Sequence, residues 1–128
     1  MKKSVIPERF SHYYNEWHFA PASKIDNFVF CSGVTGTQPG RDISSDPETQ
    51  FRAAFETVSL YLEEAGLSLR DIVEMTTYHV DLRAHLDIFM RVKDEYIKEP
   101  YPAWSAIGVS ELITEGAFVE IRVIAHRS

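Results

Sequence analysis

The sequence predicts a single α+β domain in which two helices pack against one β-sheet. Three observations indicate this class. The chain has 128 residues, of which 45% are hydrophobic and 25% charged, as expected for one globular domain over residues 1–128. Two segments carry apolar residues at helical spacing, and five shorter segments are rich in β-branched or aromatic residues. Their order is β-β-α-β-α-β-β, which lacks the strict βαβ rhythm of a parallel α/β sheet.

Two strands and a long helix are predicted in the first half of the chain. A short strand is expected around Trp17–Ala22, and residues 27–33, NFVFCSG, are typical of a buried strand that ends on small residues. Asp46 is a suitable N-cap for a helix that begins at Pro47, and Gly66 is a suitable C′ residue. One apolar face of this helix contains Phe51, Phe55, Val58, Leu62 and Ala65.

The second half predicts three more strands and a second helix. Strands are expected over residues 71–81, 104–109 and 118–125, and a helix over residues 86–98 that Pro100 must end. Two helices can cover only one face of the resulting sheet. The other face must find a partner, and symmetric self-association is the commonest solution.

Composition excludes several classes of partner. The formal net charge is −6, whereas nucleic-acid binding needs clustered cations. No apolar run approaches the roughly 18 residues of a membrane span, and the opening MKKSVIPERF lacks the apolar core of a signal peptide. Cys31 is the single cysteine and cannot pair within the chain, which favours a reducing compartment. The sequence therefore predicts a cytoplasmic protein with no nucleic-acid or membrane partner.

Metal and phosphate sites are not predicted. The five histidines lack metal-ligand spacing, and residues 33–40 have neither the glycine spacing nor the lysine of a phosphate-binding loop. His79 lies beside the apolar interior of a predicted strand and is expected to be a hydrogen-bonded core histidine. Cys31 is expected to be a small buried hydrophobic residue.

Glu120 is the main candidate for chemistry. It lies within FVEIRVIA, where most neighbours are apolar, and a buried carboxylate must be paired, hydrogen-bonded or protonated. One interpretation is an ion pair with Arg122, which shares its strand face. The other is a proton-handling carboxylate whose pKa burial raises. The residues alone leave both open.

The order and spacing of several short motifs resemble a known family. The chain is similar to the RidA/YjgF family of reactive-intermediate deaminases, also described as endoribonuclease L-PSP-like proteins, from about Trp17 to the C-terminus. The motifs are Phe30-Cys-Ser-Gly33, Gln50, Glu64-Ala-Gly-Leu67, Asp71-Ile-Val73, Pro102-Ala103, Val119-Glu-Ile121 and Ile124-Ala125.

The resemblance implies a chorismate-mutase-like α+β fold that assembles as a homotrimer with a barrel-like centre. Clefts between subunits would bind a small-molecule ligand. Active members of the family hydrolyse enamines and imines such as 2-aminoacrylate to a ketoacid and ammonia, and they need no cofactor. In these members an arginine binds the substrate carboxylate and a glutamate on the last strand positions water.

The resemblance also shows where this sequence departs from the family. Glu120 matches the glutamate, but Trp104 occupies the position of the arginine. Phe19 occupies the position of a pocket tyrosine, and Lys93 falls near that of an asparagine. The pocket thus keeps its carboxylate and loses a cation and a hydroxyl group, although Arg122 or Lys93 is a possible replacement for the cation.

We therefore expect an imine or enamine hydrolase whose substrate needs no carboxylate. Glu120 would orient water, Trp104 and Phe19 would form apolar walls, and Ser32, Gly33, Ser105 and Ala106 would line the cleft. The alternative is a non-catalytic trimer that binds a small ligand or a partner protein in the same clefts. An endoribonuclease is a third interpretation, which the acidic composition opposes.

Overall fold

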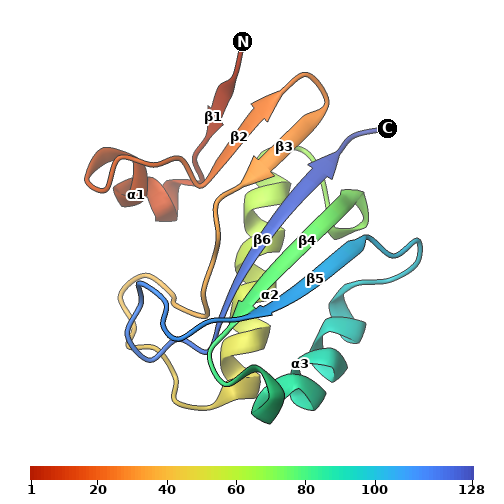
Figure 1. The fold of residues 1–128 in the computed structure, drawn as a ribbon. Coiled ribbons are helices and arrows are strands. Elements are labelled where there is room, and N and C mark those ends of the chain that lie inside the picture. Colours follow the sequence, from red (N-terminus) through yellow and green to blue (C-terminus); the bar gives the residue numbers. More distant parts are fainter.

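Six strands form one mixed sheet in the computed structural model, which describes all 128 residues. The order across the sheet is β1-β2-β3-β6-β4-β5 (Figure 1). The strands are β1 (Lys3–Val5), β2 (Ala22–Ile25), β3 (Phe28–Cys31), β4 (Ile72–His79), β5 (Ala103–Gly108) and β6 (Val119–His126). The helices are α1 (Ser11–Asn15), α2 (Pro47–Glu64) and α3 (Leu82–Tyr96), with 3-10 turns at Glu8–Phe10 and Leu69–Asp71.

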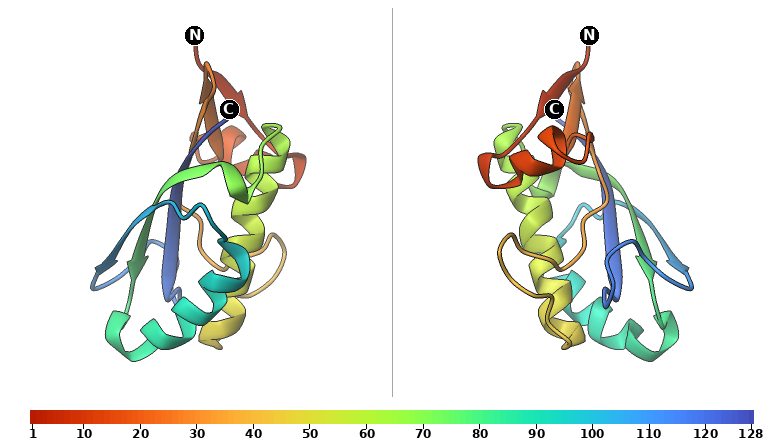
Figure 2. Two further views of the ribbon diagram at one scale, coloured as in Figure 1. Left: turned by 90° about the vertical axis from the view of Figure 1, so that its right-hand side faces the viewer. Right: turned by 90° about the vertical axis from the view of Figure 1, so that its left-hand side faces the viewer.

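The two long helices lie on the same face of the sheet. In the two side views of Figure 2, α2 and α3 lie on one side of the sheet, and its other face carries no long helix. Strands β4 and β5 are parallel and are connected through α3, and all other neighbouring strands are antiparallel. Strand β5 is an edge strand, so its outer side has no strand partner within the chain. The predicted α+β class, with two helices on one sheet face, is confirmed.

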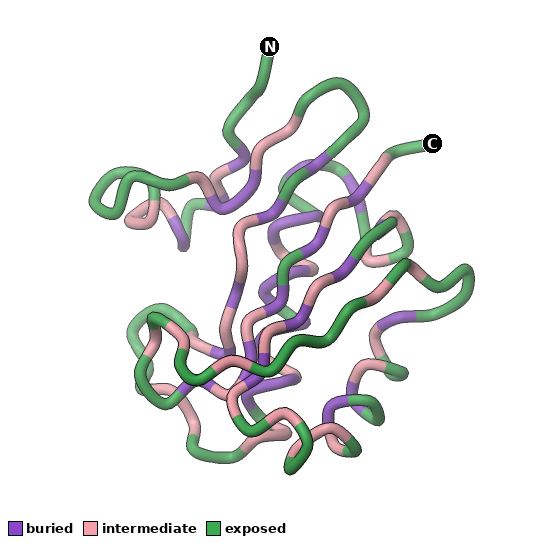
Figure 3. The backbone as a smooth tube through the Cα atoms, in the orientation of Figure 1, coloured by how far each residue is buried: buried purple, intermediate pink, exposed green.

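The hydrophobic core lies between this sheet and the helices, as the buried segments in Figure 3 show. Alternate residues of β6 point into it, and Val119, Ile121, Val123 and Ala125 are at most 1% exposed. Strand alternation places the residues between them, including Glu120 and Arg122, on the open face. The core therefore fixes the direction of the candidate carboxylate. None of the helices has the combined length and apolar character of a membrane-spanning segment.

Helix α2 begins and ends as the sequence predicts. The Asp46 carboxylate accepts a hydrogen bond from the Thr49 backbone N–H at 2.9 Å, and Gly66 follows the helix with a φ of 81°. Gln50 is fully buried in the helix. Its Nε2 donates to the carbonyls of Ser44 (2.7 Å) and Gly116 (2.8 Å), and the Phe118 N–H donates to its Oε1 at 2.8 Å. Gln50 thereby holds the loop before α2, at Ser44, next to the loop before β6, at Gly116 and Phe118.

The N-terminal region differs from the prediction. The strand expected around Trp17–Ala22 is wrong, because β2 begins at Ala22 and residues 17–20 form an irregular, mostly exposed connection. Strand β1 and helix α1 were not predicted. Helix α3 begins at Leu82, four residues before the predicted start, after Asp81 in a left-handed conformation with a φ of 58°. The N-terminal additions matter for the site, since they cover one end of the sheet beside β3.

Candidate functional site

Glu120 lies near the start of the central strand β6, on the open face of the sheet. It is opposite Tyr78 in the antiparallel register of β4 and β6 and is half-buried. The four ion pairs of the chain lie within or between α2 and α3, and none includes Glu120 or Arg122. The ion pair between these two residues, one of the two interpretations that the sequence leaves open, is thus not present. Burial raises the pKa of the Glu120 carboxyl above its ordinary value, which is the behaviour of a proton-handling group.

Gly33 leaves the space that the Glu120 side chain occupies. A Cβ atom on Gly33 would lie 2.5 Å from Oε2, 2.6 Å from Cδ and 2.8 Å from Cγ of Glu120. These distances are far below van der Waals contact. Hydrogen bonds between Val34 and Ile121 in both directions (2.9 and 2.8 Å) hold the Gly33 backbone against β6. The carboxylate is therefore seated directly on a backbone segment that has no side chain.

We expect Gly33→Ala to displace the carboxylate without unfolding the protein. The new methyl group contacts the flexible end of a side chain, so the free energy of unfolding should change by no more than about 1 kcal/mol. Any activity that depends on the position of Glu120 should fall by about tenfold or more, since small displacements of a reacting group are costly. Urea unfolding and turnover of the same preparation check this. Full activity in a stably folded Gly33→Ala variant contradicts it.

A pocket of about 460 Å³ opens in front of Glu120 and Gly33, and we call it the carboxylate pocket. Aromatic side chains dominate its wall. Tyr13 stacks on Phe19 with ring centroids 5.0 Å apart, and Phe10 contacts Tyr61 edge to face at 5.2 Å. Its aromatic lining residues are Phe10, His12, Tyr13, Trp17, Phe19 and Tyr61.

The carboxylate pocket contains one acidic side chain, that of Glu120, and no lysine or arginine to balance its charge. A substrate carboxylate would meet another carboxylate there and no cation, which is unfavourable in a partly desolvated site. Aromatic faces instead attract apolar groups, other rings and cations. Within one chain the carboxylate pocket therefore favours a neutral or cationic group.

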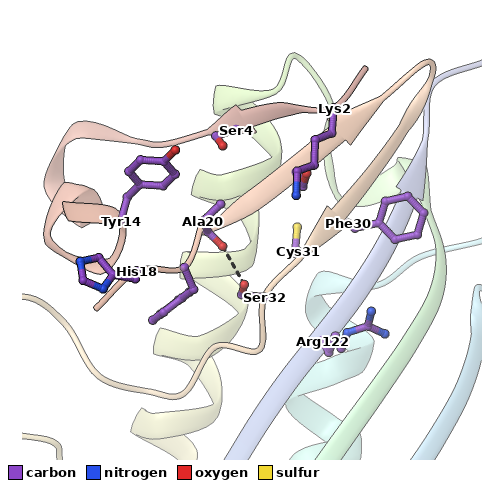
Figure 4. Close-up of a pocket in the computed structure, with 11 residues that line it drawn as sticks. Lys2, Ser4, Tyr14, His18, Ala20, Phe30, Cys31, Ser32 and Arg122 are labelled. Carbon is purple, nitrogen blue, oxygen red and sulfur yellow. Dashed lines mark hydrogen bonds between the residues drawn. The ribbon is translucent and has the colours of Figure 1, made fainter. Parts of the chain in front are cut away.

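A second pocket, of about 650 Å³, adjoins the first, and we call it the basic pocket. Phe19 lines both pockets. Figure 4 shows residues of the basic pocket, with Ser32 at its centre donating a hydrogen bond to the Ala20 carbonyl at 2.7 Å. Burial raises the pKa of Cys31 to about 12, although the charge of Arg122 lowers it in part. The thiol is therefore protonated and is not a nucleophile, as expected of a buried cysteine.

Trp104 lies away from both pockets. In the register of β4 and β5 it is level with Met75, whose side chain is buried beneath the helices. Its indole Nε1 donates a hydrogen bond to Thr77 Oγ1 at 3.0 Å, and its ring contacts Phe89 at a centroid distance of 6.0 Å. The Lys93 ammonium lies 4.9 Å from the ring centroid, a cation–π contact. The indole is thus partly buried between β5 and α3.

His79 and Trp104 share one hydrogen-bond partner, the hydroxyl group of Thr77. The Nε2 atom of His79 lies 2.7 Å from Thr77 Oγ1, and the histidine side chain is 1% exposed. Thr77 accepts from the indole and has its own hydroxyl proton to donate to an unprotonated Nε2. Burial, followed by the charge of nearby His85, lowers the pKa of His79 to about 4. The prediction of a hydrogen-bonded core histidine is confirmed.

Of the seven predicted site residues, three meet in one pocket. Glu120, Gly33 and Phe19 line the carboxylate pocket, and Ser32 lines the adjoining basic pocket. Ser105 lies on the open face, but β4 separates it from β6. Alternation along β5 directs Ala106 to the same face as Trp104. A single chain therefore brings together the predicted residues of β3 and β6 and leaves those of β5 at the sheet edge.

Several pocket residues were not predicted. Phe10 comes from the N-terminal 3-10 turn, Tyr13 from α1, Trp17 from the turn after α1, and Tyr61 from α2. The density of aromatic residues between Phe10 and Phe19 was the available sequence signal. It had no interpretation without knowing that this segment folds back beside β3.

The chain is a small α+β protein whose sheet is covered by helices on one face only. Its half-buried carboxylate lies in an aromatic pocket, as in proteins that bind or convert a small molecule. Comparisons with known proteins narrow this class. A sequence model of the family described as endoribonuclease L-PSP matches residues 12–127. The chain therefore belongs to this family, which is also called the RidA/YjgF family.

Individual relatives agree with this assignment. The RutC family protein YjgH of Escherichia coli is 32% identical over 126 residues, which are 98% of this chain and 95% of that protein. A solved structure of protein YJGH superimposes with a TM-score of 0.88 and 33% identity over 98% of this chain and 95% of that chain. The 3-aminoacrylate deaminase RutC of Acinetobacter baylyi is 34% identical over 112 residues, 84% of this chain and 86% of that protein.

Proposed function

We propose that the protein hydrolyses the C–N bond of a small imine or enamine, with Glu120 as the catalytic carboxylate. The observation that carries the proposal is the half-buried Glu120 with a raised pKa, free of any ion pair and seated against Gly33 at the carboxylate pocket. The family assignment supports the reaction class, since a relative is named 3-aminoacrylate deaminase.

The reaction requires one water molecule and one group that handles its proton. Water adds to the carbon of the C=N bond, and Glu120 accepts a proton from the water and passes it to the nitrogen. The C–N bond of the resulting carbinolamine then breaks to give a carbonyl compound and ammonia. A carboxylate with a raised pKa suits both proton transfers because its affinity for a proton is closer to that needed near neutral pH.

The substrate choice is proposed to differ from that of relatives that act on an aminoacrylate. The carboxylate pocket has no cation, and Trp104 stands where the resemblance places the carboxylate-binding arginine. We propose that a homotrimer brings the edge strand β5 of one chain, with Trp104, Ser105 and Ala106, to the carboxylate pocket of the next. The part of the imine that lies at Glu120 would then be apolar, aromatic or cationic, and no cofactor or metal takes part.

The second candidate is a non-catalytic member of the family that binds a small ligand or partner protein in the same cleft. Two observations favour it. No lysine or arginine lines the carboxylate pocket, and Phe19 has no hydroxyl group, whereas the resemblance places a tyrosine at this position. Under this alternative the pocket binds its ligand without turnover.

A panel of imines distinguishes the two candidates. Amino-acid oxidases generate α-carboxy imines in situ, and alkyl and aryl imines provide the carboxylate-free arm. We expect ammonia release above background, with kcat/KM for 2-aminoacrylate lower than for the best carboxylate-free imine by roughly a hundredfold, since a missing charged partner costs about 2–5 kcal/mol. Saturable ligand binding without ammonia release supports the non-catalytic candidate. Efficient turnover of 2-aminoacrylate contradicts the proposed substrate choice.

A further inference from the structure

The basic pocket has a charge opposite to that of its neighbour. Lys2, His18 and Arg122 line it, and no acidic residue does. Hydroxyl groups of Ser4, Tyr14, Ser23 and Ser32 complete its polar lining. These side chains come from distant segments (Figure 4): Lys2 lies just before β1 and Ser4 within it, Tyr14 lies in α1 and His18 follows that helix, and Arg122 lies on β6. A local excess of cations in a chain of net charge −6 requires a reason.

Arg122 is the most informative of these residues. Strand β6 lies inside the sheet between β3 and β4, and the residues on either side of Arg122, Ile121 and Val123, are buried in the core. Its side chain is therefore held on the open face, away from the acidic residues of the helices. It takes part in none of the ion pairs of the chain. A guanidinium group in such a place presents five donors that match a carboxylate or phosphate.

The two pockets are close enough to hold one ligand. Glu120 and Arg122 are two residues apart on the same strand face, a spacing of about 7 Å. Phe19 forms a wall of both pockets, and Ser32 and Gly33 follow each other along the chain, one in each pocket. The turn that leads to Phe19 has the same arrangement, since Trp17 lines the carboxylate pocket and His18, with a φ of 62°, lines the basic pocket.

We propose that the basic pocket binds an anionic group, carboxylate or phosphate, of the ligand whose C=N bond lies at Glu120. The position of the C=N bond at Glu120 rests on the proposed function. The anion site itself does not depend on that proposal. The spacing places the anion several bonds from the reacting carbon. The ligand therefore differs from 2-aminoacrylate, in which the carboxylate is attached directly to that carbon.

Anion binding is measured without turnover. Isotope-labelled protein is titrated with inorganic phosphate and, separately, with acetate at constant ionic strength, while NMR follows the Arg122 side-chain N–H and the Ser32 amide. We expect saturable shifts confined to the basic pocket. Arg122→Gln should weaken binding by about tenfold or more, since a charge-assisted bidentate contact is lost. Tighter binding of phosphate identifies a phosphate-bearing ligand, and equal or tighter binding of acetate identifies a carboxylate.

Two further variants test the anion site, one as a control outside the basic pocket and one as a second change within it. Arg83→Gln is the matched control, since Arg83 is exposed on α3, lines neither pocket and carries the same charge. It should bind the probes as the unchanged protein does. Lys2→Gln, at the exposed start of the chain, should weaken binding without affecting the core, and it replaces Arg122→Gln if that variant does not fold. Equal effects of the Arg83 and Lys2 or Arg122 variants, or shifts that do not saturate, overturn the site.

The link to the carboxylate pocket has its own test. Two N-unsubstituted imines of equal chain length are compared as substrates, one with a carboxylate at the far end of its carbon chain and one without. The ω-carboxy imine should have a kcat/KM about tenfold or more higher, and Arg122→Gln should abolish that preference. Equal rates for both imines refute the link but leave the anion site standing. Saturable anion binding by a protein that turns over no imine refutes only the proposed reaction, so the two failures are distinguishable.

Discussion

Glu120→Gln is expected to lower the turnover of every imine substrate by at least about 100-fold, the contribution typical of a positioned acid or base. The amide is nearly the same size as the carboxyl group, so Gly33 can still accommodate it. It cannot accept the proton of the attacking water. Steady-state ammonia release measures the loss, and size-exclusion chromatography checks that the assembly is unchanged. Unaltered kcat removes Glu120 from the mechanism.

The pH dependence of the same variant identifies the group that titrates. Burial raises the pKa of Glu120, so kcat/KM of the unchanged protein should rise with pH through a midpoint above the ordinary glutamate value of about 4.3. This ascending limb should be absent in Glu120→Gln. Glu74→Gln is the matched control, because Glu74 is an exposed glutamate of β4 on the same open face. Its profile should match that of the unchanged protein.

The stability of Glu120→Gln separates lost chemistry from lost folding. A carboxyl group whose folded pKa is raised contributes full stability below the pKa of the unfolded chain, about 4.3, and loses it as the pH rises through the folded pKa. At pH 7 the unchanged protein therefore carries the penalty of a partly buried charge. The glutamine variant should be at least as stable there. A variant that is both inactive and less stable at pH 7 does not support the assignment.

The sequence predicts best the elements whose ends carry explicit local signals. Helix α2 has an N-cap at Asp46, proline at its first position and a C′ glycine, and each of these is confirmed. Strand β6 follows from strict alternation around Glu120. Strand β2 was misplaced because Trp17 and Phe19 resemble strand residues, whereas Ala22–Ile25 has a weak strand pattern. The available sequence signal for the hairpin was the turn-forming pair Asp26-Asn27, and in the structure Asp26 is left-handed with a φ of 51°.

The candidate site was predictable only where its residues belong to short sequence motifs. The resemblance identified Glu120, Phe19, Ser32 and Gly33, and the fold gathers them at two adjoining pockets. Alternation along β5 already implies that Trp104 and its neighbour Ser105 face opposite sides of the sheet. The basic pocket was not predictable, since Lys2 and Arg122 are 120 positions apart in sequence. Only the antiparallel stack of β1, β2, β3 and β6 places them together.

Acid is expected to destabilise the protein through His79. The pKa of this buried histidine is lowered to about 4, whereas the unfolded chain has an ordinary histidine pKa of about 6.5. Between these values the unfolded chain binds a proton that the folded chain does not. The stability that His79 contributes is therefore complete above pH 6.5 and is lost as the pH falls toward 4. The full loss corresponds to about 3 kcal/mol.

Urea unfolding between pH 4 and pH 7 measures this loss, and His79→Gln isolates it from the titration of the carboxylates. The glutamine amide keeps a polar atom near Thr77 but binds no proton, so the free energy of unfolding should depend less steeply on pH in this variant. The absolute stability at pH 7 should fall because the imidazole contacts with Phe51 and Phe89 are lost. The slope, not the absolute value, is therefore the readout.

His126→Gln is the matched control for the same measurement. His126 is half-buried at the end of β6 and contacts Phe28 edge to face, outside the group formed by Thr77 and Trp104. Its replacement should leave the pH dependence nearly unchanged. If His79→Gln and His126→Gln flatten the profile equally, the histidine beneath α3 is not the group that titrates. A steep loss in both the unchanged protein and His126→Gln, with a flatter profile only in His79→Gln, ties acid sensitivity to His79, whose hydrogen-bond partner Thr77 also holds Trp104 against β4.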